Sequence, residues 1–176
     1  MVGVISRKDL SLLAKKMEKD YLSLFKGKRK YLFYYVCGLV DGEGSFSVSF
    51  TKHPTLSSGW LVDPVFQVYQ HQNNVEVLYL LKEVFGAGSI YRKNGKHPVM
   101  VFGIHSRRSL EEKIIPFFKK YPLIVKRESF KIFCQIIELM NRKEHLKREG
   151  IRKIYQLARK MNLQGKGRKY SLKDFS

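Results

Sequence analysis

The stretch Tyr35-Val-Cys-Gly-Leu-Val-Asp-Gly-Glu-Gly-Ser-Phe46 carries apolar helical residues, two glycines and two acids directly into a strand pattern. Its apolar residues fall on one stripe of a short helix, which we predict over about residues 31–42. Gly38 and Gly42 are four residues apart and share one face of that helix. Each glycine lowers helix stability by roughly 1 kcal/mol relative to alanine. Because the usual compensation is close approach to another backbone, we expect this face to pack against a second helix.

Glu43 lies at the C-terminal end of the predicted helix, where the helix dipole is already negative. A carboxylate at this end is unfavourable unless a cation compensates it, so Glu43 is a candidate cation ligand. The alternative is a surface acid in a tight turn between helix and strand. Asp41 is expected to be structural and to form hydrogen bonds near the helix end.

Two strands are predicted after the motif, because the period of the pattern changes from helical to two at Ser45. Residues 53–61 contain Pro, Ser and Gly and read as a loop, and a second strand follows over about residues 62–71. Together the two strands make a hairpin. The alternating residues of the first strand are Phe46, Val48 and Phe50 on one face and Ser45, Ser47, Ser49 and Thr51 on the other.

Asn73 and Glu76 have the spacing of a capping box ahead of an apolar helix. A second hairpin is predicted over about residues 89–106, with Asn94-Gly95 at its turn.

Ser109 and Glu112 are predicted to open a short helix, and a longer helix is predicted over about residues 126–141. The resulting order is helix, strand, strand, helix, strand, strand, helix. It predicts an α+β fold (αββαββα) with one four-stranded antiparallel sheet.

Helical extensions are predicted on both sides of this core. An amphipathic pattern covers residues 6–25, and a last helix precedes a basic tail that starts near Gly165. We therefore expect an N-terminal extension at residues 1–29, a domain at residues 30–142, and a C-terminal helix and tail at residues 143–176.

The composition indicates a folded protein that binds a polyanion. Its 176 residues carry 34 Lys and Arg against 15 Asp and Glu, a net charge of +19, and 44% of them are hydrophobic. This hydrophobic content excludes a simple disordered basic tail. Nucleic acid is the leading partner because phosphate contacts provide affinity without regard to sequence. Charge alone would favour a ribosomal protein or another basic RNA-binding protein.

Cys37 and Cys134 are too far apart for a zinc motif, and both fall among apolar residues. We expect buried free thiols, which are typical of a reducing compartment. The sequence shows no signal-peptide pattern and no apolar run near the length of a membrane span. An intracellular protein without membrane association is therefore expected, in the cytoplasm, nucleoid or an organelle matrix.

The segment Val36-Cys-Gly-Leu-Val-Asp-Gly-Glu-Gly44, followed by Ser45-Phe46, resembles the motif of the LAGLIDADG homing endonucleases. That family has the same order of elements, so the resemblance covers about residues 31–141. The departures are Cys37, where alanine is common, and Glu43, where aspartate is commoner.

The resemblance implies a homodimer, since only one copy of the motif is present. The two motif helices would meet through Gly38, Leu39 and Gly42, which would bring two Glu43 carboxylates together near DNA. In the family, a divalent metal is bound by this acid and by the preceding carbonyl, here that of Gly42. Mg²⁺ suits such an oxygen-only site.

Two further site residues are implied by local resemblance. The segment Phe66-Gln-Val-Tyr-Gln70 resembles the one that carries a water-positioning glutamine, which makes Gln70 the match. The segment Pro122-Leu-Ile-Val-Lys-Arg-Glu-Ser-Phe130 resembles the one that carries a lysine near the cleavage site. Lys126 is the better match there, and Arg127 is the alternative.

Residues that read DNA are expected on the exposed sides of the strands and beside the second hairpin turn. They are Ser47, Ser49, Thr51 and His53 on the first strand, Gln67 and Tyr69 on the second, and Arg92, Lys93 and Lys96 at the turn. Each of them also suits an ordinary solvent-facing position.

The resemblance therefore implies a Mg²⁺-dependent endonuclease that hydrolyses both strands of a long, nearly palindromic DNA site and is encoded by a mobile intron. Two alternatives on the same fold are an intron maturase, which binds its own intron RNA, and a DNA-binding regulator without cleavage. The acid at Glu43, together with Gln70 and Lys126, favours the nuclease.

Overall fold

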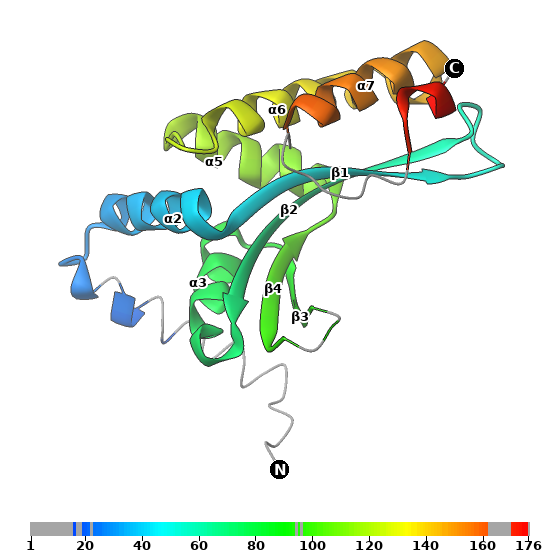
Figure 1. The fold of residues 1–176 in the computed structure, drawn as a ribbon. Coiled ribbons are helices and arrows are strands. Elements are labelled where there is room, and N and C mark those ends of the chain that lie inside the picture. The colour runs from blue at the N-terminus through cyan, green and yellow to red at the C-terminus, as the bar shows by residue number, and fades with distance from the viewer. Residues whose placement is uncertain are drawn as a thin grey trace. The chain divides into compact units, whose positions relative to one another are not determined.

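The computed structural model describes residues 16, 19–21, 23–93, 95, 97–161 and 170–175. The described elements follow the predicted order of the core (Figure 1). The four strands form one sheet in the order β1-β2-β4-β3, so the α+β prediction is confirmed. The elements are α2 (Arg29–Glu43), β1 (Gly44–Lys52), β2 (Trp60–His71), η1 (Gln72–Asn74), α3 (Glu76–Phe85), β3 (Ser89–Arg92), β4 (Val99–Ile104), α4 (Arg107–Ser109), η2 (Leu110–Ile114), α5 (Ile115–Lys120), α6 (Arg127–Asn141), η3 (Glu144–Leu146), α7 (Arg148–Met161) and η4 (Leu172–Phe175).

The chain divides into two compact units. Unit 1 holds residues 1–45 and 67–122, and unit 2 holds residues 46–66 and 123–176. The strands β1 and β2 pass from one unit into the other. The expected limits of the domain at residues 30–142 stay a prediction.

Aromatic side chains hold unit 1 together. Phe33 of α2 contacts the rings of Phe117 and Tyr121 at centroid distances of 5.4 and 5.1 Å. Phe85 of α3 contacts Phe117 at 5.0 Å, and its ring stacks on that of Phe102 in β4. In the same unit β3 pairs antiparallel with β4. The buried residues of α2 are Leu32, Val36, Cys37 and Val40.

In unit 2, α6 and α7 lie side by side (Figure 1) and share a core with the first residues of β2. The short C-terminal helix η4 brings Phe175 into this core. The centroid of the Phe175 ring lies 4.4 Å from that of Trp60 and 4.3 Å from that of Tyr155. Ser129 also links α6 to the end of α7 by donating to the Met161 carbonyl at 3.0 Å.

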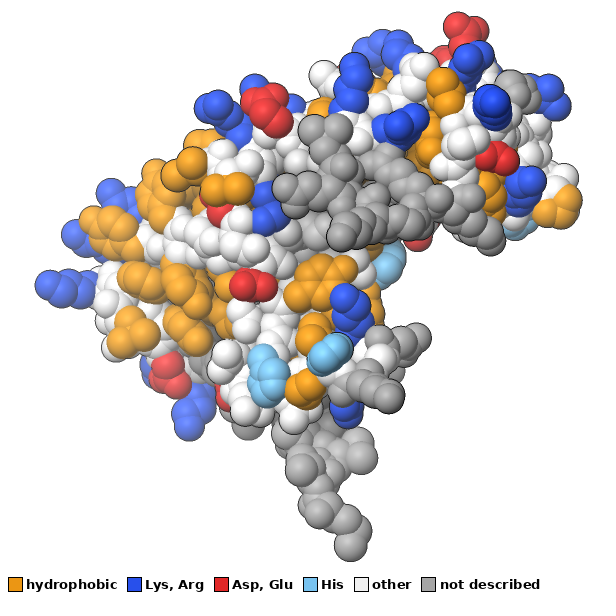
Figure 2. Space-filling model, in the orientation of Figure 1, with side chains coloured by type: hydrophobic (Ala, Val, Ile, Leu, Met, Phe, Trp, Pro, Cys, Tyr) orange, Lys and Arg blue, Asp and Glu red, His pale blue; other side chains and the backbone are white. Residues whose placement is uncertain are grey.

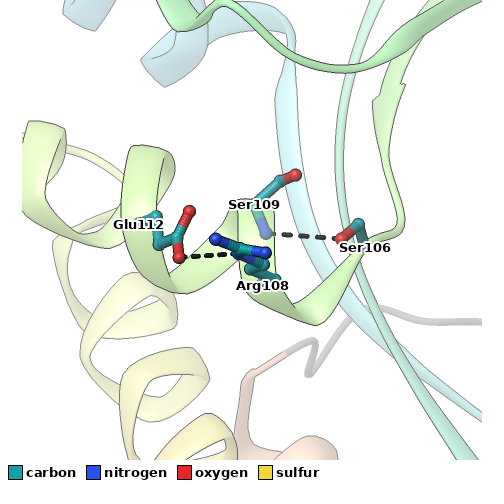
Figure 3. A network of polar contacts seen from close by, with 4 residues as sticks. All are labelled: Ser106, Arg108, Ser109 and Glu112. Atoms are coloured by element: carbon teal, nitrogen blue, oxygen red, sulfur yellow. Dashed lines mark hydrogen bonds and ion pairs between the residues drawn. The ribbon is translucent and has the colours of Figure 1, made fainter.

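The predicted start of the helix after β4 is wrong. Ser106, rather than Ser109, caps it, and the Ser106 Oγ accepts the Ser109 N–H at 3.4 Å (Figure 3). Glu112 accepts from Arg108 Nε at 2.8 Å instead of completing a capping box. The reason is backbone conformation: Ser106 is extended and can turn its oxygen toward the first N–H groups, whereas Ser109 is already helical.

The predicted cap of α3 is also wrong. Asn73 lies inside the 3-10 helix η1, so its backbone is already helical, and α3 begins at Glu76. His71 takes the capping position of η1, and its Nδ1 accepts the Asn73 N–H at 3.2 Å.

Some predictions fall on segments outside the described residues. They concern most of the helix over residues 6–25, the turn residue Asn94, the side chain of Lys96 and the start of the basic tail. Within the part of the chain that the structure describes, no helix has both the length and the apolar character needed to span a bilayer.

Candidate functional site

The chain passes from helix to strand at Gly44. Glu43 ends α2, Gly44 begins β1, and the Gly44 N–H donates to the Val40 carbonyl. A Cβ at Gly44 would lie 2.6 Å from the Val40 carbonyl oxygen and 2.7 Å from its Cγ1. A larger residue at Gly44 would require a shift of this backbone, so glycine lets the helix that ends at Glu43 pass directly into β1.

Glu43 is exposed at the negative end of the α2 dipole, and the last turn of the helix contains no basic residue. Gly42 is exposed beside it, and Asp41 is half-buried. Carboxylate and carbonyl oxygens are the ligands that Mg²⁺ and Ca²⁺ prefer. Among the described residues, however, no group of three or more His, Cys, Asp and Glu side chains is placed to hold a metal ion. The donor chemistry of Glu43 and the Gly42 carbonyl nevertheless fits a hard cation.

The glycine face of α2 is not covered by any of the residues that the structure describes. Gly38 and Gly42 are exposed, and a Cβ at either position would meet no atom within 4 Å. Leu39 between them is half-buried. Figure 2 shows hydrophobic side chains gathered over α2, where the exposed members are Tyr31, Tyr34 and Tyr35. No neighbour among the described residues requires glycine at these two positions.

The opposite stripe of α2 is closed around Cys37. Its Sγ donates to the Tyr121 carbonyl at 3.2 Å. Burial, with a smaller contribution from the Asp41 carboxylate, raises the pKa of the Cys37 thiol to about 11. The thiol therefore stays protonated at neutral pH and is structural. Neither Cys37 nor Cys134 forms a disulfide, as predicted, although Cys134 is only half-buried.

Gln70 is half-buried near the end of β2 in unit 1, the unit that also holds Glu43. In unit 2, Lys126 is the N-cap residue of α6 and is half-buried. Arg127 next to it is exposed, and its Nε lies 3.6 Å from the Glu128 carboxylate. The catalytic roles of Gln70 and Lys126 stay predictions.

The residues predicted to read DNA are mostly exposed. Ser49, Thr51, His53, Arg92 and Lys93 are exposed, whereas Ser47, Gln67 and Tyr69 are half-buried.

Three of them come together on unit 1. The Tyr69 hydroxyl donates to Gln67 Oε1 at 2.8 Å, and Lys93 Nζ lies 4.9 Å from the centroid of the Tyr69 ring. Successive side chains of a strand point to opposite faces of the sheet. Arg92 follows Tyr91 in β3, so the two side chains lie on opposite faces.

Sequence reasoning missed Tyr91, which contacts Gln67, and Gly103 and His105, which lie beside Tyr91. Tyr91 accepts a hydrogen bond from Gln67 Nε2 at 2.7 Å, and its hydroxyl lies 3.4 Å from His105 Nε2. The available signal was a glycine inside an apolar strand, which marks close approach of another group.

Comparisons with known proteins agree with this architecture. A model of the LAGLIDADG endonuclease family matches residues 36–137. The chain is 42% identical over 117 residues to the DNA endonuclease I-CeuI of Chlamydomonas moewusii, a match that covers 63% of this chain and 53% of I-CeuI. It is 32% identical over 111 residues to the homing endonuclease I-ApeII of Aeropyrum pernix, covering 63% of this chain and 65% of that protein. The chain thus spans about half to two thirds of the length of these relatives.

Solved structures are similar over a larger share of the chain. The homing endonuclease I-TnaI superposes with a TM-score of 0.72 at 39% identity, covering 80% of this chain and 92% of I-TnaI. The archaeal intron-encoded homing endonuclease I-Vdi141I, solved in complex with DNA, superposes with a TM-score of 0.76 at 34% identity, covering 84% and 94%. Motif, strand order and relatives agree, and the chain belongs to the LAGLIDADG endonuclease family.

Proposed function

We propose that this chain is a site-specific double-strand DNA endonuclease of the homing type, which acts as a homodimer with bound Mg²⁺. The observation that carries the proposal is the position of Glu43. It is an exposed carboxylate at the end of a helix whose glycine face is open. A second copy packed on this face would place a second Glu43 beside the first and so add a second carboxylate to the site.

The relatives support a DNA substrate. I-CeuI is a DNA endonuclease, and I-Vdi141I was solved with DNA bound. The net charge of +19 suits a partner whose backbone carries phosphates.

In this proposal, Glu43 and the Gly42 carbonyl would hold the metal ion beside the scissile phosphates. When bound, Mg²⁺ supplies a Lewis acid for the phosphate and lowers the pKa of an attacking water. Gln70 orients that water through its amide. Lys126 would place a positive charge near the scissile phosphate, and Arg127 is the alternative for this role.

A cleavage assay tests the proposal. The purified protein is incubated with a plasmid library that carries randomised sites, with Mg²⁺ or with EDTA, and the cut ends are sequenced. We expect cleavage at one family of related, nearly palindromic sites and none with EDTA. Glu43→Gln keeps the shape of the side chain and removes its charge, so it should reduce the cleavage rate by roughly a thousandfold or more.

Glu149→Gln is the matched control, because Glu149 is an exposed acid on α7. It should leave the cleavage rate unchanged. A protein that cuts no member of the library in Mg²⁺ yet binds structured RNA tightly would contradict the nuclease and favour the maturase alternative.

A further inference from the structure

Four side chains on one face of the unit 1 sheet form a continuous chain of hydrogen bonds. The Tyr69 hydroxyl donates to Gln67 Oε1 at 2.8 Å, and Gln67 Nε2 donates to the Tyr91 hydroxyl at 2.7 Å. That hydroxyl lies 3.4 Å from His105 Nε2. The chain therefore joins β2 to β3 and to the end of β4, and Gln67 lies at its centre.

Tyr91 reaches Gln67 across a strand, since β4 lies between β2 and β3 in the sheet. Gly103 of β4 makes the crossing possible. A Cβ at Gly103 would lie 3.0 Å from the Tyr91 hydroxyl, 3.1 Å from its Cε1 and 3.1 Å from His105 Nε2. Glycine weakens a strand interior and commonly marks close approach of another group. The crossing of Tyr91 thus explains why this position lacks a side chain.

The two tyrosine hydroxyls hold the plane of the Gln67 amide from both sides. A glutamine amide has two donor hydrogens and two acceptor lone pairs. Tyr69 occupies one lone pair and Tyr91 one hydrogen, so one acceptor and one donor remain for a ligand. Burial, with a smaller contribution from Tyr91, raises the pKa of Tyr69, so its phenol keeps the proton that it donates. Lys93 lies over the same ring, where a cation is attracted.

We propose that Gln67 reads one adenine in each half of the DNA site and that Tyr69, Tyr91 and Gly103 are its positioning residues. The inference rests on the proposed function. In the major groove adenine presents an N6 donor and an N7 acceptor, which complement the acceptor and donor left on Gln67. Because the amide is held before DNA arrives, little side-chain freedom is lost on binding. Guanine presents two acceptors in the major groove, so it would leave the remaining acceptor of Gln67 unpaired.

Selection from a randomised duplex library tests this reading. All variants carry Glu43→Gln so that DNA is bound but not cut, and the bound sequences are counted. We expect an adenine preference at one symmetry-related pair of positions. Gln67→Ala should lower that preference roughly tenfold to a hundredfold. Tyr91→Phe and Gly103→Ala should lower it at the same positions, because the first removes the hydroxyl and the second displaces the ring.

Tyr79→Phe is the matched control, since Tyr79 is a half-buried tyrosine on α3 outside this network. It should leave every base preference unchanged. A second measurement needs no DNA: the side-chain amide signals of Gln67 in a ¹⁵N spectrum should shift in Tyr91→Phe and stay in place in Tyr79→Phe.

Failure of base reading by Gln67 can be distinguished from failure of the proposed nuclease function. If the unmodified protein cuts a defined site with Mg²⁺ but Gln67→Ala and Tyr91→Phe retain every base preference, this inference is overturned and the nuclease stands. The inference is likewise overturned if the variants lose affinity equally for all sequences, because Gln67 would then only contact the backbone. If the unmodified protein cuts no member of the library, the proposed function and this inference both fall.

Discussion

Gly38 and Gly44 stand six residues apart in the same motif but differ in their surroundings. A Cβ at Gly44 would press on the carbonyl oxygen and Cγ1 of Val40, whereas a Cβ at Gly38 meets open space. We expect Gly44→Ala to lower the free energy of unfolding by about 1–3 kcal/mol. In the monomer, at protein concentrations below the dimer dissociation constant, Gly38→Ala should raise it by up to about 1 kcal/mol, because alanine favours the helix. Urea unfolding followed by circular dichroism measures both, and equal effects at the two positions would contradict the geometry.

Lys126 and Arg127 are adjacent cations, and exchanging each for alanine separates their proposed roles. Lys126→Ala should reduce the single-turnover cleavage rate by about 10²–10⁴-fold, the range for a group that acts directly on the reacting atoms. Arg127→Ala should reduce it less than about tenfold, since an exposed ion pair such as the one with Glu128 contributes little. The reverse order of effects would transfer the role to Arg127.

At the scale of elements, the exposed face of α2 predicts how two copies assemble. Gly38→Leu places a branched side chain on the face where we propose that two helices meet. The molar mass measured by light scattering should fall from that of a dimer to that of a monomer. The monomer should still unfold cooperatively. Arg152→Leu adds the same side chain at an exposed position of α7 and serves as the control. Unchanged dimer affinity in Gly38→Leu would locate the contact elsewhere.

The C-terminal turn predicts a dependence on pH. Asp174 Oδ2 accepts from the Ser171 N–H at 2.7 Å and from Ser171 Oγ at 2.9 Å. These bonds, that of the backbone N–H first, lower the pKa of Asp174 below its ordinary value of 3.8. A lowered pKa stabilises the folded turn at pH values above 3.8, and the contribution is lost as the pH falls through the folded value.

Trp60 reports on this turn, because it is the only tryptophan and its ring lies 4.7 Å from that of Tyr170. We expect its fluorescence to change in acid before the far-ultraviolet circular dichroism does. Asp174→Asn should remove that early step, and Glu149→Gln should preserve it. An early step that survives in Asp174→Asn would assign the titration to another group.

How far the sequence predicts the elements depends on how local their causes are. The change from helix to strand at Ser45 was predictable, because the helical and the strand pattern of apolar residues can each be recognised from neighbouring positions in the sequence. The cap at Ser106 was not, because Ser106 and Ser109 carry the same side chain and only backbone conformation separates them. Gly103 signalled the close approach of another group, but its partner Tyr91 was beyond prediction, because the contact with Gln67 depends on β4 lying between their strands. The exposed place of Glu43 at a helix end agrees with the prediction, and its catalytic role stays a prediction.

For the whole molecule, the net charge of +19 predicts a steep dependence of DNA binding on salt. A protein that contacts about 6–10 phosphates loses roughly 10³–10⁵-fold in affinity between about 50 and 200 mM salt. We expect the affinity for unrelated duplexes to fall within this range, and fluorescence anisotropy measures it. Gln67→Ala should not alter the slope, because a residue that reads a base releases no counterions. A slope that is flat in the unmodified protein would contradict phosphate binding as the main source of affinity.

The open face of α2 has a further consequence for how the activity would depend on dose. Under the proposed dimer, the metal site takes one carboxylate from each copy. At protein concentrations well below the dimer dissociation constant, the active species would then grow with the square of the concentration of chains. A tenfold drop in expression would therefore lower the concentration of active dimer, and with it the cleavage rate, about a hundredfold. The same bare glycines that loosen a helix would therefore protect a host genome from a nuclease present at only a few copies.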